Sequence, residues 1–331
     1  MHVGLVGAGR IGRYHARALT ASPLVSAVTI TDADPARAER AAVEVGARCA
    51  PSAEALVQDG VDALMIAAAT PAHAPLVHLA AEAGLPAFCE KPIALDLATT
   101  DAVLEHVAAA GILLQIGFQR RFDPGYRAAR DAVRSGGLGD LSLVRIAAHD
   151  PVPPSEEYLA TSGGIWRDLL IHDFDVVPWV TGREVVEVFT QGSASSALFA
   201  RQGDVDAAAA VLRFAGGLLG VLSASRQDPL GYDVRLELFG SRDSLAVGLD
   251  ERTPLRSAEP GVPAPARPAY RDFMERFEAA YEAELRAFLE AVRDGLSSPC
   301  TGEDARQALR VALAAERSRA EHRPVRVEEV G

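Results

Sequence analysis

Lys91 is the only lysine in this sequence of 331 residues, and it marks the first place where chemistry is expected. Lysine and arginine together number 33, so the other 32 basic residues (33 − 1) are arginines. A guanidinium stays protonated near neutral pH, whereas an ammonium is compact and its pKa responds to desolvation. A chain that uses arginine elsewhere but keeps one lysine indicates a need for an amine; chance survival in a biased composition is the alternative.

Asp168 and His172 are the second pair of residues suited to chemistry. They stand four residues apart in a stretch whose apolar residues recur at helical spacing, so the pattern predicts one helix with both side chains on the same face. Histidine exchanges a proton near pH 7, and a carboxylate one turn away can orient the ring and stabilise the imidazolium. An ordinary surface pair is the alternative; the nucleotide fold described next favours catalysis.

A glycine-rich loop near the start of the chain indicates what these residues work with. An apolar strand, residues 2–6, leads directly into Gly7-Ala8-Gly9-Arg10-Ile11-Gly12, which opens an amphipathic helix reaching about Thr20. In this order of strand, G-x-G-x-x-G and helix, the glycines allow a tight turn and close approach of a pyrophosphate, and the helix N-terminus favours negative charge. Gly7, Gly9, Arg10, Ile11 and Gly12 are therefore predicted to bind a dinucleotide.

Asp32 indicates which dinucleotide is bound. It ends a second predicted strand, residues 25–31, and follows Gly12 by 20 residues (32 − 12). An acidic side chain there accepts hydrogen bonds from the ribose hydroxyls and repels a 2′-phosphate, which predicts NAD as the cofactor. The alternative is a turn or helix-cap aspartate, because Asp34-Pro35 follows.

Strands and helices continue to alternate as far as Gly117. Helices are predicted near residues 35–45, 53–59, 73–83 and 97–110, and strands at 63–68, 86–91 and 112–117. This alternation predicts an α/β Rossmann domain, a doubly wound parallel sheet that binds ligands at the carboxyl ends of its strands. Two such ends carry Thr70, Pro71 and His73, and Glu90 and Lys91. For Thr70, Pro71 and His73, a cofactor contact and a plain turn are equally open.

The pattern changes after residue 118. Strands are predicted at residues 141–148, 185–191, 207–214, 218–225, 233–239 and 244–249, with Gly216-Gly217 fitting a hairpin turn. They predict an α+β domain with a large, mostly antiparallel open sheet. A wrapping loop with five prolines (254–268), a long helix (271–294) and a helix capped by Thr301 and Asp304 follow. We expect domains at 1–118 and 119–300, with the helix and tail of 301–331 packing back on the first domain.

Composition narrows the class of protein. The net charge is −12, which argues against a nucleic-acid or membrane partner. Cys49, Cys89 and Cys300 lie far apart without paired metal-ligand spacing, so no metal site is expected. The chain begins with a strand instead of a signal peptide, which together with the cysteines favours a reduced, cytoplasmic protein.

These motifs resemble those of the glucose-fructose oxidoreductase/inositol dehydrogenase (Gfo/Idh/MocA) family, and within it the inositol 2-dehydrogenase-like enzymes. The resemblance extends over essentially the whole chain. It is carried by the glycine loop with His15, by Thr70-Pro71-Ala72-His73, Cys89-Glu90-Lys91-Pro92, Gly164-Ile165-Trp166-Arg167-Asp168, Ile171-His172-Asp173-Phe174-Asp175, Gly231-Tyr232-Asp233, and Arg276-Phe277 with Ala280-Tyr281. The combination of Glu-Lys-Pro with Asp-x-x-x-His is specific to this family.

The resemblance implies an NAD-dependent oxidoreductase that oxidises a secondary hydroxyl of a cyclitol. It implies that His172 is the catalytic acid/base, Asp168 its partner and Lys91 the group on the reacting oxygen. It further implies that three residues approach the substrate: Arg120, His149 and Tyr232. A cis peptide before Pro92 and a homo-oligomer, dimer or tetramer, formed through the open sheet face are also implied.

One departure from the family pattern concerns the substrate. This chain reads His149-Asp150-Pro151 where many inositol enzymes carry His-Arg-Asn, and the loss of an arginine and an amide changes which hydroxyls are recognised. The expected partner is thus a small polyol or sugar. A sugar or aldose dehydrogenase, a keto-sugar reductase and a non-catalytic NAD-binding sensor are the alternative functions.

Overall fold

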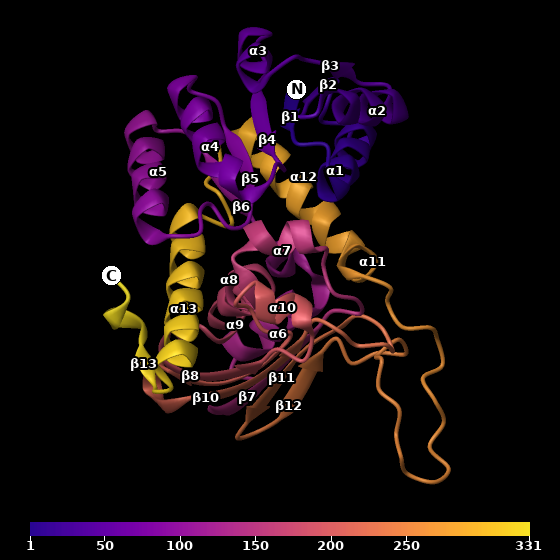
Figure 1. The fold of residues 1–331 in the computed structure, drawn as a ribbon, viewed down its shortest axis with the longest axis vertical. Coiled ribbons are helices and arrows are strands. Elements are labelled where there is room, and N and C mark those ends of the chain that lie inside the picture. The colour runs from indigo at the N-terminus through magenta and orange to yellow at the C-terminus, as the bar shows by residue number, and fades with distance from the viewer. The chain divides into compact units, whose positions relative to one another are not determined.

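The computed structural model describes all residues from Met1 to Gly331. The chain divides into two compact units (Figure 1). The first unit comprises residues 1–119 and 281–307, and the second comprises residues 120–280 and 308–331. Each unit is built on one β-sheet.

The first unit contains the doubly wound sheet that the alternating pattern predicts. Its strands are β1 (His2–Val6), β2 (Ala27–Thr31), β3 (Arg48–Cys49), β4 (Ala63–Ile66), β5 (Ala87–Glu90) and β6 (Leu114–Gly117). Its helices are α1 (Arg10–Ala21), α2 (Pro35–Val45), α3 (Ala53–Gln58), α4 (His73–Glu82) and α5 (Leu97–Ala110), with the 3-10 turn η1 (Thr70–Ala72). All pairings are parallel, in the order β3-β2-β1-β4-β5-β6. The order reverses between β1 and β4, where such sheets bind ligands.

The central strands of this sheet are mostly apolar because helices cover both of its faces. Figure 1 shows α1 and α2 on one side of the sheet and α4 and α5 on the other. Leu5, Ile30, Met65 and Phe88 are fully buried between these layers. The sheet therefore presents only its strand ends to ligands.

Helix α12 (Glu278–Asp294) corrects the expected domain boundary. From Tyr281 onward the chain belongs to the first unit, although residues up to 300 were predicted in the second domain. Leu285, Phe288 and Leu289 lie in the same hydrophobic core as Val3 and Phe88. Helical spacing predicts that this face is buried, but not which sheet it packs against. The predicted helix 271–294 is also interrupted at Phe277 (φ −114°, ψ 20°), which separates α11 (Phe273–Arg276) from α12.

The second unit contains the large open sheet. Its strands are β7 (Leu141–His149), β8 (Val185–Ser193), β9 (Ala207–Phe214), β10 (Leu219–Ser225), β11 (Asp233–Gly240), β12 (Ser244–Val247) and β13 (Val325–Arg326). Its helices are α6 (Pro124–Arg134), α7 (Glu156–Ser162), α8 (Gly164–Asp168), α9 (Ile171–Thr181) and α10 (Ala197–Arg201), with the 3-10 turns η2 (Gln119–Phe122), η3 (Ala215–Gly217) and η4 (Val327–Glu329). The order is β12-β11-β7-β10-β9-β8-β13, and only β7 and β10 pair in parallel. The predicted mostly antiparallel sheet and the hairpin at Gly216-Gly217 are confirmed.

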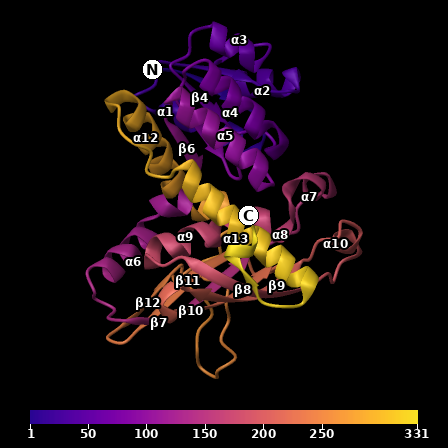
Figure 2. The same ribbon diagram turned by 90° about the vertical axis from the view of Figure 1, so that its left-hand side faces the viewer.

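Helices cover one face of this sheet. Figure 2 shows α6, α9 and α13 (Gly302–Glu321) lying over the same side of the strands. On the opposite side, alternate residues of β9 and β10 are exposed, including Val211 and Val221, each 48% exposed, whereas Leu212 and Leu222 point into the core. The period of two that predicts a half-buried sheet is thus present.

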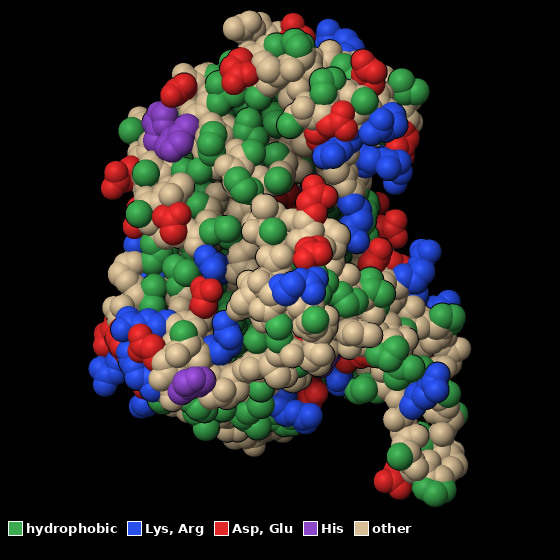
Figure 3. Space-filling model, in the orientation of Figure 1, with side chains coloured by type: hydrophobic (Ala, Val, Ile, Leu, Met, Phe, Trp, Pro, Cys, Tyr) green, Lys and Arg blue, Asp and Glu red, His purple; other side chains and the backbone are tan.

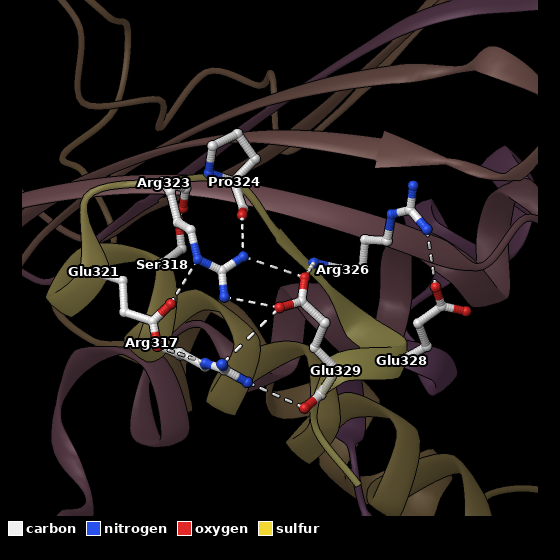
Figure 4. Close-up of polar contacts among 8 residues, drawn as sticks. All are labelled: Arg317, Ser318, Glu321, Arg323, Pro324, Arg326, Glu328 and Glu329. Atoms are coloured by element: carbon white, nitrogen blue, oxygen red, sulfur yellow. Dashed lines mark hydrogen bonds and ion pairs between the residues drawn. The ribbon is translucent and has the colours of Figure 1, made fainter.

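The C-terminal tail packs differently from the prediction. Residues 302–307 of α13 belong to the first unit, but residues 308–331 belong to the second. Strand β13 adds to the edge of the large sheet, with Val325 opposite Val188 of β8. A network of arginines and glutamates holds the tail, including Arg323 with Glu321 (2.6 Å) and with Glu329 (2.7 Å), as Figure 4 shows. The backbone of β13 pairs with the edge of β8, so the tail extends the large sheet.

The proline-rich segment forms a long loop, as predicted. Figures 1 and 3 show it projecting away from the strands and helices of the second unit instead of wrapping around them. At its base, Arg252 donates to the carbonyl of Pro268 (2.8 Å), and its Cζ atom lies 4.0 Å from the centre of the Tyr270 ring.

None of the helices combines the length and the apolar character that a membrane crossing requires.

Candidate active site

The glycine loop has the tight geometry that its pattern predicts. Gly7 has a φ of +101°, and a Cβ there would lie 2.5 Å from the backbone of Ala67 and Ala68 at the end of β4. A Cβ on Gly12 would overlap the carbonyl of Gly7. Both glycines are therefore needed for the turn itself and for the packing of α1 on the sheet.

Gly9 has a different role, because a Cβ there would meet no other atom within 4 Å. It is the N-cap residue of α1, and no side chain caps this helix. An uncapped helix start with open space above it lets the phosphates of a ligand approach the backbone N–H groups. The loop thus fits the pyrophosphate of a dinucleotide.

Asp32 lies beside this loop, immediately after β2. Its Oδ2 accepts the N–H of Ala8 (2.7 Å) and its Oδ1 accepts the N–H of Asp34 (2.8 Å). The Arg37 guanidinium is 3.6 Å from the same carboxylate. The acid is held by the chain at the position where it would receive ribose hydroxyls, and the residues of this edge fit NAD.

His73 begins α4, and its ring contacts the backbone of the protein. The ring is 1% exposed, with Nδ1 2.7 Å from the carbonyl oxygen of Pro92 and Nε2 3.0 Å from that of Ala68. Burial lowers the pKa of His73, so the ring is neutral and donates to one of the two oxygens at a time. His73 ties the loop after β4 to the turn after β5; the preceding Thr70 and Pro71 form η1.

Glu90 and Lys91 lie at the end of β5. Glu90 Oε1 is 2.7 Å from Nε2 of the buried His15. A Cβ on Gly117 of the neighbouring strand would lie 2.9 Å from Glu90 Oε2, so this glycine makes room for the carboxylate. Lys91 is partly buried, and the Lys91–Pro92 peptide is cis, as the resemblance implies.

Asp168 and His172 do not share one continuous helix, which corrects the prediction from their spacing. The N–H of Leu170 bonds the carbonyl of Ile165 (3.0 Å), a step of five residues, and this extra residue separates α8 from α9. Asp168 therefore ends α8 and His172 lies in the first turn of α9. A local helical period does not reveal such an insertion, because both halves keep apolar residues facing the core.

The Asp168 carboxylate is almost fully buried and receives two charge-assisted hydrogen bonds. Tyr158 donates its hydroxyl to Oδ1 (2.8 Å), and Arg226 donates from Nη2 to Oδ2 (2.8 Å). Such bonds favour the ionised carboxylate and fix its orientation. Neither partner was predicted from the sequence.

The first turn of α9, which carries His172, is anchored by two buried ion pairs. Asp173 accepts from Arg120 (2.5 Å), and Asp175 accepts from Arg121 in a bidentate pair (2.6–3.1 Å). Arg120 and Arg121 are consecutive residues of η2. The pairs thus fix the part of α9 that directly follows His172.

Arg120 is more deeply buried than a direct substrate role suggests. Only 1% of it is exposed, and its guanidinium lies over the Phe277 ring (5.7 Å). Asp173, Tyr126 and Tyr232 surround it closely enough to raise its pKa against the opposing effect of burial. Through its ion pair with Asp173, Arg120 anchors α9.

His149 and Tyr232 come from adjacent strand ends of the large sheet. His149 ends β7 and pairs with Asp233, the first residue of β11, directly after Tyr232. His149 Nε2 is 3.3 Å from Ser223 Oγ, and burial lowers its pKa. Tyr232 is 4% exposed, and burial raises its pKa. The end of β7 and the start of β11 lie side by side because the two strands are antiparallel.

Asp150 occupies the position of the sequence departure, and its side chain is already engaged. Its Oδ2 accepts from Arg226 Nη1 (3.0 Å). Among 32 arginines with similar surroundings in the sequence, nothing distinguishes Arg226, and its contact with Asp168 spans 58 residues. Tyr158 likewise follows no motif.

A doubly wound sheet with an uncapped glycine-rich helix start, together with an α+β unit that carries an acid and a histidine, defines a two-domain dinucleotide-dependent oxidoreductase. Residues 1–118 match the oxidoreductase family with an NAD-binding Rossmann fold, and residues 126–246 match the GFO/IDH/MocA C-terminal domain. The chain belongs to the GFO/IDH/MocA oxidoreductase family, which confirms the resemblance.

Similar proteins match along their whole length. The chain is 44% identical over 322 residues to the myo-inositol dehydrogenase Hyg17 of Streptomyces leeuwenhoekii, covering 96% of this chain and 97% of that protein. Its structure is similar to that of a probable dehydrogenase from Thermotoga maritima, with a TM-score of 0.93, 36% identity and complete coverage of both chains. It is also similar to a scyllo-inositol dehydrogenase from Lactobacillus casei with bound NAD(H) and scyllo-inositol, with a TM-score of 0.90, 29% identity and 99% coverage of both chains.

Proposed function

We propose that this protein is an NAD-dependent dehydrogenase that oxidises a secondary hydroxyl of a cyclitol to a ketone. The observation that carries the proposal is the full-length similarity to inositol dehydrogenases in a chain that also contains Lys91, Asp168 and His172. Known relatives act on myo- and scyllo-inositol, so the substrate class is a cyclitol.

Each of the three residues has a distinct task in this proposal. NAD, when bound, accepts the hydride from the carbon that carries the hydroxyl. His172 takes the hydroxyl proton as general base, and the Asp168 carboxylate orients the imidazole and stabilises its protonated form. The Lys91 ammonium stabilises the negative charge that develops on the oxygen.

The cofactor is proposed to bind along the strand ends of the first unit. Gly9, Arg10, Ile11 and Gly12 would hold the pyrophosphate at the start of α1, and Asp32 would receive the ribose hydroxyls. Gly7 shapes the turn. The remaining proposed cofactor residues are Thr70, Pro71, His73, Glu90 and Lys91, of which His73 acts through the backbone that it ties together.

Substrate recognition is proposed to use His149 and Tyr232 with Lys91, Asp168 and His172. The origin of His149 and Tyr232 at the adjacent ends of β7 and β11 supports the choice of these two residues. We propose that Arg120 contributes indirectly, because its ion pair with Asp173 fixes the turn that carries His172.

The test is NADH formation, followed by absorbance, with purified protein, NAD and a panel of myo-inositol, scyllo-inositol, chiro-inositols, glucose and xylose. Turnover of one or more cyclitols is the expected result. Turnover of glucose or xylose alone would replace the proposal by a sugar dehydrogenase. Tight NADH binding without turnover of any compound, in either direction, would leave the sensor function in its place.

We also propose that two or four copies associate through the open sheet face. Phe189, Val211 and Val221 form one row across β8, β9 and β10 and are 37%, 48% and 48% exposed. Val211→Glu should reduce the mass measured by light scattering, whereas Val43→Glu, at an exposed position of α2, should not. A cytoplasmic setting is proposed from the free thiols of Cys49, Cys89 and Cys300 and the use of NAD.

A further inference from the structure

A buried arginine joins two acids at the edge of the large sheet. Arg226 directly follows β10 and is 3% exposed. Its Nη2 donates to Asp168 Oδ2 (2.8 Å), and its Nη1 donates to Asp150 Oδ2 (3.0 Å). The two arms of one planar guanidinium are thus divided between two carboxylates, a geometry that lysine cannot reproduce.

Backbone hydrogen bonds fix the positions of Arg226 and Asp150. The N–H of Arg226 bonds the carbonyl of Asp206 (2.8 Å), and the N–H of Asp150 bonds the carbonyl of Ser225 (2.8 Å). The carbonyl of Asp150 in turn accepts from the N–H of Asp228 (2.7 Å). Strands β7 and β10 are parallel neighbours, so Asp150 and Arg226 leave the sheet side by side.

The charges of the bridge are mutually dependent. Burial by itself lowers the pKa of Arg226, but the carboxylates of Asp168 and Asp150 raise it above the ordinary arginine value. Arg226 is therefore always charged, and its guanidinium is shared between Asp168 and Asp150. Because Asp150 shares the same guanidinium, Arg226 neutralises Asp168 less than an unshared arginine would.

Other ionisable groups contact Asp168 or lie on the same two helices, α8 and α9. They are Tyr158 on α7, which donates to Asp168; Arg167 on α8, paired with Glu316 of α13; and His172, Asp173 and Asp175 on α9, the two acids being paired with Arg120 and Arg121. Arg226 contacts the Asp168 carboxylate directly.

We infer that Arg226 is a positioning residue for the catalytic Asp168, and that Asp150 sets how strongly Arg226 neutralises it. The inference rests on the proposed function, in which Asp168 partners His172. Asp150, the residue that departs from the family pattern, then tunes proton transfer instead of binding a substrate hydroxyl. The bridge Asp150–Arg226–Asp168 acts as one unit.

Two substitutions in this bridge should have opposite effects on the pH dependence of cyclitol oxidation. The Asp168–His172 pair titrates as a coupled system, and His172 must be neutral to accept a proton. Arg226→Met removes a cation, which raises the pKa values of the pair, so the acidic limb of kcat moves to higher pH by about one unit or more. Asp150→Asn removes an anion and moves the limb to lower pH.

Matched variants separate this effect from a general loss of structure. Arg276→Met breaks another mostly buried pair of the same unit, that of Arg276 with Asp123 (2.9 Å), and should lower stability without moving the limb. Arg226→Lys keeps a positive charge, so its acidic limb should lie between those of the wild type and Arg226→Met. Movement of the limb in the same direction in Arg226→Met and Asp150→Asn, or no movement in either, overturns the inference. If Arg226→Met does not fold, Arg226→Lys takes its place. The acidic limb should then move to higher pH in Arg226→Lys and to lower pH in Asp150→Asn, and movement in the same direction or no movement overturns the inference.

A second readout does not need turnover. In Arg226→Met, buried carboxylates lose their cation, so their pKa values rise above those of the unfolded chain. The folded variant then binds more protons than the unfolded chain as pH falls, and its melting temperature should approach that of the wild type between pH 8 and pH 5. If the two melting temperatures converge but the wild type turns over no compound of the panel, the proposed function is wrong and the Arg226 inference stands. A constant difference in an active enzyme would defeat the Arg226 inference alone.

Discussion

The Nε2 atom of His15 lies 2.7 Å from the Oε1 atom of Glu90 in the interior of the first unit. His15 comes from α1, the helix that follows the glycine loop, and Glu90 is the last residue of β5, directly before Lys91. The pair therefore connects the start of the proposed cofactor site with the strand end that carries the single lysine. Phe88 and Tyr281 pack against the His15 ring and keep water away from it.

Removal of His15 should destabilise the protein strongly. In His15→Leu, Glu90 remains buried without this partner, and breaking a buried pair in this way costs about 3–5 kcal/mol. Urea unfolding at pH 7.5 measures the change. Arg13 lies on the same helix as His15, and Arg13→Gln breaks its exposed ion pair with Glu44 of α2, so this change should have a much smaller effect. Equal effects of the two substitutions would contradict the role assigned to the buried pair.

Replacement of the lysine should separate binding from turnover. Lys91→Arg keeps a positive charge but cannot place a compact ammonium on the reacting oxygen. We expect kcat to fall by about two to three orders of magnitude, as when one group that stabilises an oxyanion is lost. NADH binding, measured by fluorescence titration, should change little. Near-normal turnover of this variant would refute the role of Lys91.

Asp32 should determine the choice of cofactor. Asp32→Ser loses hydrogen bonds from the ribose to a carboxylate, so KM for NAD should rise about tenfold or more. The loss of negative charge should also admit NADP, because Arg37 lies 3.6 Å from the carboxylate and can face a 2′-phosphate. In the double variant Asp32→Ser/Arg37→Gln the gain with NADP should disappear. The ratio of kcat/KM for the two cofactors measures both effects.

His73 should make stability depend on pH. Burial lowers its pKa in the folded state, so its contribution is complete above the unfolded value, about 6.5, and is lost as pH falls through the lower folded value. We expect wild-type stability in urea to decrease from pH 7.5 to pH 5. His73→Gln should flatten this decrease. The pKa of His149 is also lowered by burial, so adding His149→Gln should flatten it further. An unchanged slope in both variants would contradict this assignment.

Gly164 should be more sensitive to substitution than Gly203. Both have positive φ, +80° and +66°, so alanine at either position costs about 1–2 kcal/mol in backbone energy. A Cβ on Gly164 would also lie 2.9 Å from Oδ1 of Asp204, the atom that accepts the N–H of Ile165 in α8, whereas a Cβ on Gly203 meets nothing within 4 Å. Gly164→Ala should therefore lose more stability in urea unfolding, and it should also lower turnover because α8 carries Asp168.

Features that depend on neighbouring residues could be predicted from the sequence. The alternation of apolar strands and amphipathic helices predicts the doubly wound sheet, since each element must bury an apolar face. The glycine loop and Asp32 predict the cofactor edge, because these residue types at this spacing are what a backbone turn and a ribose require. The rarity of lysine singles out Lys91 without any structural information.

Features that depend on distant residues were decided by the tertiary structure. The apolar face of α12 is evident in the sequence, but its burial in the first unit depends on which sheet offers a matching surface. The break between α8 and α9 arises from one extra residue that the helical period conceals. Arg226 resembles the other arginines of the chain, and its contacts with Asp168 and Asp150 exist only because parallel strands β7 and β10 end side by side. The sequence alone determined which residues can do chemistry; the packing of strands and helices decided which charges surround them.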